Sequence, residues 1–127
     1  MDSTISSHPD YAALSHTQKV QLQLIYDRRF NQFDGPRVVD DLINNKSLWI
    51  AALMTRSTEQ LGVGITLRDL PANYYNVDTL YLTTNSITKL KKLAKKWEAD
   101  EISEIEDPGS FLGSYPPKMK VLCLWWD

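Results

Sequence analysis

The sequence predicts one α/β or α+β domain built on a mixed sheet of about four strands, with N-terminal helices packed on the sheet. A strand, an amphipathic helix and a second strand follow one another over 78–105, which is the order of a βαβ unit. The length of 127 residues is that of a single domain, so we expect one unit over 1–127 with residues 1–8 flexible. The apolar fraction of 43% and charged fraction of 24% are ordinary for a globular protein.

The first expected helix lies between about Pro9 and Phe30. Ser15 and Gln18 have the spacing of a capping box, and alanine and glutamine favour a helix here. Within 18–26, however, apolar residues also alternate with polar ones, which is typical of a strand. This segment therefore stays open between helix and strand, with helix favoured.

A second helix is expected after Asp34-Gly35-Pro36, because aspartate suits an N-cap and proline suits the first turn. The apolar residues that follow form one helical face: Val38, Val39, Leu42 and Ile43. The run 48–54 is apolar throughout, so its periodicity does not separate a buried helix from a buried strand. Its alanines favour helix.

The second half predicts strands at 62–68 and 78–83, the latter rich in β-branched and aromatic residues. A helix over 86–98 follows, with its lysines opposite an apolar arc of Ile87, Leu90, Leu93, Ala94 and Trp97. A short strand at 102–105 would then pair in parallel with 78–83. The last strand, 118–126, is apolar on both faces, so we expect it to be central.

The charge balance argues against a nucleic-acid or membrane-surface partner. The net charge is −2, and the lysines of the 86–98 helix are followed at once by the acidic stretch 98–107, which screens them. No apolar run is long enough to span a membrane. We therefore expect an acidic cytoplasmic protein that binds neither nucleic acid nor membrane.

Residues that usually carry chemistry are few. The only histidines are His8 and His16, and the only cysteine, Cys123, lies in the most apolar strand, where a thiol is inert. No spacing of histidine, cysteine and carboxylate residues matches a metal site, and no nucleotide or hydrolase motif occurs. We expect no metal, no cofactor and no catalytic residue.

These observations favour a non-catalytic protein-interaction or regulatory module that binds a protein partner or a second copy of itself. The expected contact patch is aromatic, because tyrosine and tryptophan are enriched at interface hot spots. It combines two tyrosines of the 69–77 loop with the C-terminal tryptophans: Tyr74, Tyr75, Trp125 and Trp126.

The alternative is a small ligand-binding domain or enzyme. Ligands of open α/β sheets collect beyond the carboxyl ends of parallel strands, here 83–86 and 106–110. In this interpretation an aspartate acts as a base and a hydroxyl group contacts the ligand. The candidate residues are Arg68, Asp69, Thr84, Asn85, Ser86 and Asp107.

Overall fold

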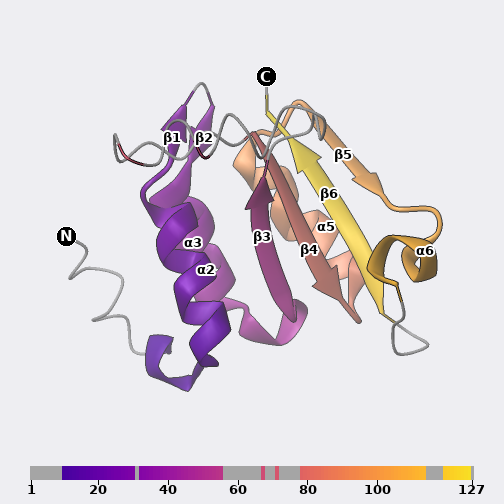
Figure 1. Cartoon of the computed structure of the whole chain (residues 1–127), viewed down its shortest axis with the longest axis horizontal. Helices are drawn as coiled ribbons and strands as arrows, with labels where there is room; N and C mark the ends of the chain where they lie inside the picture. Colours follow the sequence, from indigo (N-terminus) through magenta and orange to yellow (C-terminus); the bar gives the residue numbers. More distant parts are fainter. Residues whose placement is uncertain are drawn as a thin grey trace.

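A four-stranded antiparallel sheet forms the centre of the molecule (Figure 1). The computed structural model describes residues 10–30, 32–55, 67, 71, 78–113 and 119–126. Across the sheet the strand order is β3-β4-β6-β5. The strands are β3 (Ala51–Thr55), β4 (Thr79–Thr84), β5 (Glu101–Glu104) and β6 (Lys120–Trp125).

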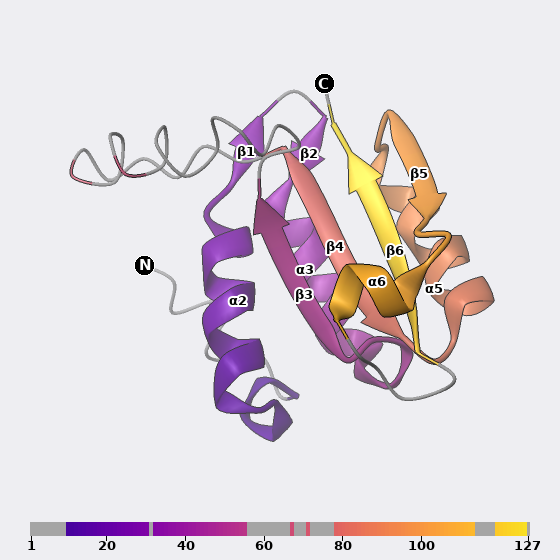
Figure 2. The ribbon, with the colours of Figure 1, turned by 45° about the vertical axis from the view of Figure 1, so that its right-hand side comes forward.

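The helices occupy distinct positions around this sheet. In Figure 2, α3 (Gly35–Asn44) and α5 (Ile87–Ala94) lie behind the sheet, whereas α6 (Pro108–Leu112) lies in front of it. Helix α2 (His16–Tyr26) runs beside the edge strand β3. Short 3₁₀ turns complete the set: η1 (Tyr11–Ala13), η2 (Lys46–Leu48) and η4 (Lys95–Trp97).

The expected parallel pairing of 78–83 with 102–105 is wrong. Strand β5 pairs with β6 and not with β4, and every pair in the sheet is antiparallel. Strands β4 and β5 still run in the same direction, because each is antiparallel to β6, which lies between them. The reason is the two-faced apolar character of β6, which favours a position with strands on both sides. Its central place in the sheet was predicted correctly.

The helix favoured for 48–54 is also wrong. Lys46–Leu48 form a 3₁₀ turn, and Ala51–Thr55 form β3. Burial alternates along this strand: Ala52 and Met54 face the core, opposite Leu82 and Leu80 of β4. Pairing with β4 therefore overrides the weak helix preference of the alanines.

Helix α2 explains the ambiguous pattern of 18–26. The capping box is present: Gln18 N–H donates to Ser15 Oγ at 3.1 Å, and Ser15 N–H donates to Gln18 Oε1 at 2.9 Å. Leu22 and Ile25 are buried, whereas the exposed side chains Val20 and Leu24 are apolar too. The helix thus has apolar side chains on two sides, which imitates the alternation of a strand.

Other predicted elements have mixed outcomes. Helix α3 begins at Gly35 with Pro36 in its first turn, and its predicted apolar face is buried. The 106–110 segment, expected to lie beyond the carboxyl end of a parallel strand, leads into α6. The predicted strand 62–68 lies outside the described residues, except for Leu67, which is exposed.

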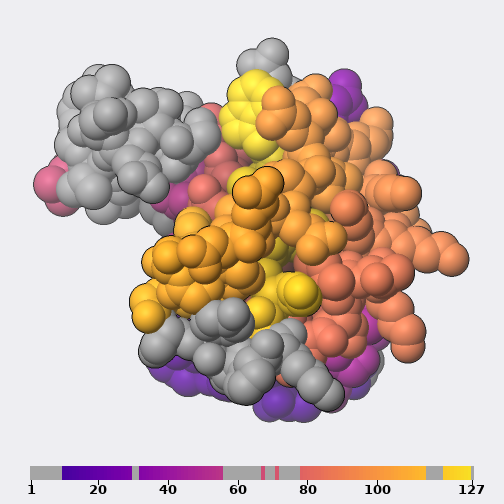
Figure 3. Space-filling view, turned by 90° about the vertical axis from the view of Figure 1, so that its right-hand side faces the viewer, coloured from indigo at the N-terminus to yellow at the C-terminus, as the bar shows by residue number. Residues whose placement is uncertain are grey.

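Helix α5 packs through the predicted face. Leu90, Leu93 and Ala94 are buried, and η4 extends this face to the buried Trp97. The lysines on the other side, Lys89, Lys92, Lys95 and Lys96, are exposed. Figure 3 shows long side chains of α5 projecting from this side of the molecule.

Replacing Leu90 by alanine is expected to lower the free energy of unfolding by about 2–5 kcal/mol, because the removed atoms are fully buried. The matched change Lys92→Ala, on the exposed side of α5, should alter it by less than about 0.5 kcal/mol. Urea denaturation of both variants measures the difference. Equal effects would mean that the buried and exposed faces are assigned incorrectly.

Gly35 allows the end of α2 to approach the start of α3. Its N–H donates to Arg28 O at 2.8 Å. A Cβ at this position would lie 2.5 Å from Arg28 O and 2.8 Å from Tyr26 O, and closer still to Ile25 O. These backbone atoms have little freedom to move, so only glycine fits.

Gly35→Ala is therefore expected to destabilise the protein by about 3 kcal/mol or more through steric overlap with backbone. Gly113→Ala is the matched control, because its Cβ would meet nothing within 4 Å and only its φ of 84° is unfavourable. That control should cost on the order of 1 kcal/mol. Thermal unfolding of both variants tests the ranking, and a smaller loss for Gly35→Ala would contradict it.

Candidate functional site

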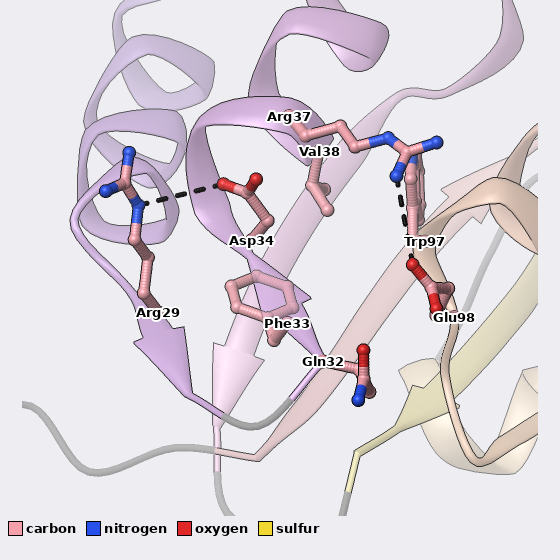
Figure 4. Close-up of a pocket in the computed structure, with 8 residues that line it drawn as sticks. All are labelled: Arg29, Gln32, Phe33, Asp34, Arg37, Val38, Trp97 and Glu98. Carbon is pink, nitrogen blue, oxygen red and sulfur yellow. Dashed lines mark ion pairs between the residues drawn. The ribbon is translucent and has the colours of Figure 1, made fainter.

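A surface pocket of about 540 Å³ lies where a short hairpin, the start of α3 and the end of η4 meet (Figure 4). The hairpin consists of β1 (Arg29–Phe30) and β2 (Phe33–Asp34). The lining combines charged, amide and aromatic groups. Its residues are Arg29, Gln32, Phe33, Asp34, Arg37, Val38, Trp97 and Glu98.

Backbone geometry brings these residues together from distant parts of the chain. The hairpin places Arg29 opposite Asp34, and the close approach at Gly35 starts α3 directly after β2. On the other wall, Glu98 has a φ of 58°, which ends the helical segment immediately after Trp97. A left-handed residue at this position is a common helix terminator, although glycine usually occupies it.

The floor of the pocket is aromatic and held in place. Phe33 and Trp97 are each 2% exposed, and the rings of Phe33 and Trp126 form a T-shaped pair with their centroids 4.7 Å apart. Trp97 Nε1–H donates to Asp41 Oδ2 at 2.9 Å. Trp126 Nε1–H donates to Trp97 O at 3.0 Å. Packing and hydrogen bonds thus fix the position of both floor rings.

The rim of the pocket carries two loose ion pairs. Arg29 Nε lies 3.7 Å from Asp34 Oδ1, and Arg37 Nη1 lies 3.9 Å from Glu98 Oε2. All four side chains are more than half exposed. Asp34 occupies the N-cap position of α3, but its side chain makes no capping hydrogen bond. Exposed pairs at such distances contribute about 0–1 kcal/mol each, so they can open to meet another molecule.

Neither family models, nor curated proteins, nor solved structures give a match to this chain.

The C-terminal tryptophans occupy different environments. Trp126 is 0% exposed and belongs to the core, so it contributes nothing to an exposed aromatic patch. Trp125 is half-buried, and its Nε1–H donates to Asp78 Oδ2 at 3.3 Å. Tyr74 and Tyr75 lie outside the described residues. Of the predicted interaction patch, the described part of the chain therefore leaves Trp125 as a surface residue.

Among the strand-end residues of the alternative site, Thr84 uses its hydroxyl for structural hydrogen bonds. The buried Thr84 hydroxyl donates to Leu48 O at 2.5 Å and accepts from Ser86 N–H at 2.8 Å. Asn85 is exposed, and Ser86 makes no side-chain cap for α5. Arg68 and Asp69 lie outside the described residues.

Asp107 caps the short helix α6. Its carboxylate accepts from Ser110 Oγ at 2.7 Å and from Ser110 N–H at 3.3 Å. These hydrogen bonds to the charged form hold the pKa of Asp107 below its ordinary value. Because β6 separates β4 from β5, Thr84 at the end of β4 and Asp107 after β5 do not lie at the ends of neighbouring strands.

Among the described residues, no group of three or more histidine, cysteine or acidic side chains could hold a metal ion. Within the same part of the chain, no helix is long and apolar enough to cross a membrane. His16 is exposed at the first position of α2, and His8 lies outside the described residues.

The sequence interpretation missed the pocket. It identified Asp34-Gly35-Pro36 as a boundary but did not recognise the hairpin before it, and it treated Glu98 as part of an acidic run. Two signals were present. Arg29 and Arg37 flank the boundary, and Glu98 directly follows the last apolar position of a helix.

Cys123 is half-buried in β6. Burial raises the pKa of its thiol, and hydrogen bonds with Tyr81 and Ser103 offset part of this rise. A raised pKa leaves less thiolate near pH 8, and the thiolate is the reactive form.

The Cys123 thiol of the folded protein should therefore react with a disulfide reagent several-fold more slowly than that of the urea-unfolded chain. An equal or faster rate in the folded protein would show that the thiol is activated.

Proposed function

We propose that this protein is a non-catalytic interaction module that docks a segment of a partner protein in this surface pocket. We name it the charged pocket, after the two arginines and two carboxylates on its rim. The observation that carries the proposal is the placement of two exposed arginines, Arg29 and Arg37, over a rigid floor formed by Phe33 and Trp97. A fixed aromatic centre surrounded by a polar rim is the usual anatomy of a protein interface. Arginine and tryptophan are also the residue types that dominate interface hot spots.

The chemistry of the lining supports binding over catalysis. The side chains around the pocket offer guanidinium, carboxylate, amide and aromatic groups, which orient a partner. None of the eight lining residues supplies a hydroxyl, thiol or imidazole group. Small-molecule sites are mostly apolar, whereas this pocket is open and has a charged rim, which favours a polar protein segment.

The same proposal includes a cytoplasmic location. It also includes a partner that is a protein, not a nucleic acid or a membrane. The aromatic surface that would combine Trp125 with Tyr74 and Tyr75 stays a prediction of a second contact region. The small-ligand alternative at 83–86 and 106–110 has less support, because the Thr84 hydroxyl and the Asp107 carboxylate already have partners within the fold.

The double variant Arg29→Ala and Arg37→Ala is expected to lose the partner while remaining folded. Each hot-spot arginine contributes about 2 kcal/mol or more to binding, so loss of one should lower the affinity about 30-fold and loss of both on the order of 1,000-fold. Both side chains are exposed, so the midpoint of thermal unfolding should hardly change. Capture from a cell extract, followed by calorimetry with the purified partner, measures the loss.

Lys92→Ala combined with Lys95→Ala is the matched control, since it removes two exposed positive charges on the outer side of α5 and its following turn. The control should retain the same partner with the same affinity. The proposal fails if the partner binds the arginine double variant as tightly as the wild type, or if the wild type retains no specific protein.

A further inference from the structure

We infer that the partner segment carries both an acidic and a basic side chain, so that its recognition depends on mixed charge. This inference rests on the proposed function, because it specifies what the charged pocket binds. The lining contains two guanidinium groups, Arg29 and Arg37, and two carboxylates, Asp34 and Glu98, so its formal charge is zero (2 − 2).

The charges alternate around the pocket in pairs. Arg29 faces Asp34 across the hairpin, and Arg37 faces Glu98 across the opening between α3 and the end of η4 (Figure 4). Neither guanidinium is buried, so each can turn toward an incoming carboxylate with little desolvation. Asp34 and Glu98 are exposed too, so each can likewise turn toward an incoming ammonium or guanidinium group with little desolvation.

A partner with charges of one sign fits this arrangement poorly. A purely acidic segment would attract Arg29 and Arg37, but it would bring its carboxylates close to Asp34 and Glu98. A purely basic segment would have the opposite conflict with the two arginines. Like charges placed together at an interface are unfavourable and suppress wrong partners. A segment with one charge of each sign leaves every rim group with an opposite charge.

Two other surfaces of the described residues give weaker support for a binding site. The side of the sheet that carries α6 exposes Leu53, and Phe111 of α6 packs there against Tyr81, but the described residues do not indicate what would cover this surface. The lysine side of α5 is partly neutralised, since Lys91 Nζ lies 3.7 Å from Glu104 Oε2. The charged pocket combines a defined volume, fixed walls and a specific charge pattern.

Three blocked tetrapeptides test the inference: one with a lysine and an aspartate, one with two aspartates and one with two lysines. The readout is the NMR resonance of the Trp97 indole N–H, because Trp97 lines the pocket. The mixed peptide should bind wild-type protein about fivefold more tightly than either single-sign peptide. Tighter or equal binding of the two-aspartate or two-lysine peptide would overturn the inference, and so would the absence of binding by all three.

Single neutralisations should shift the preference in opposite directions. Arg37→Gln leaves the lining with one positive and two negative groups, so the two-lysine peptide should then bind best. Glu98→Gln leaves two positive groups and one negative, so the two-aspartate peptide should bind best. Lys92→Gln is the control for Arg37→Gln, because it makes the same change in net charge on an exposed side chain of α5. An unchanged order of preference in either pocket variant would contradict the inference.

These experiments separate the inference from the proposed function. If a captured partner is lost with the arginine double variant but the two-aspartate peptide binds best, the docking pocket stands and mixed-charge recognition is wrong. If no partner depends on the arginines and no peptide shifts the Trp97 resonance, both are wrong.

Discussion

The hydrogen bond from Trp126 Nε1–H to Trp97 O ties the central strand of the sheet to the helical segment that packs on it. It joins the end of β6 to the last turn of the α5 segment, and it lies entirely within the core. Trp97 also donates a hydrogen bond to Asp41, which connects it to α3. Phe33 packs on Trp126, so the β1-β2 hairpin contacts the same group of rings. Large buried rings with satisfied N–H groups give both burial energy and a fixed geometry. The floor of the charged pocket is therefore a by-product of the core itself.

The antiparallel sheet follows from the same arrangement. Strand β6 has apolar residues on both faces, lies in the middle of the sheet and leads directly to the buried Trp126. Strands β4 and β5 then occupy its two sides, and α5 crosses behind β6 to connect them (Figure 1). This path returns the chain to the sheet at Glu101, just after the turn that presents Glu98. The position of that carboxylate on the pocket rim thus depends on the strand order.

Local patterns predicted much of the fold, and nonlocal pairings account for the errors. The periodicity of α3, α5 and β4 lies within each segment, so these elements were predicted from their own residues. The strand β3 is decided by its pairing with Leu80 and Leu82, which no local pattern of 48–54 contains. The pocket was missed for the same reason, since Arg37 and Glu98 meet only after α3 and α5 pack against one sheet. Loose charged side chains also leave no periodic pattern in a sequence.

Substitutions in the buried floor of the pocket and on its exposed rim have different effects on the protein. Phe33 and Trp97 are bound into the core, so substitutions there would alter stability together with shape. Arg29, Asp34, Arg37 and Glu98 stand outside the core in loose pairs, and replacing them leaves the buried contacts intact. Under the proposed function, charge reversals on the rim would change the preferred partner at little cost in folding free energy. The structure separates the buried residues that keep the pocket in shape from the exposed charged residues that line its rim.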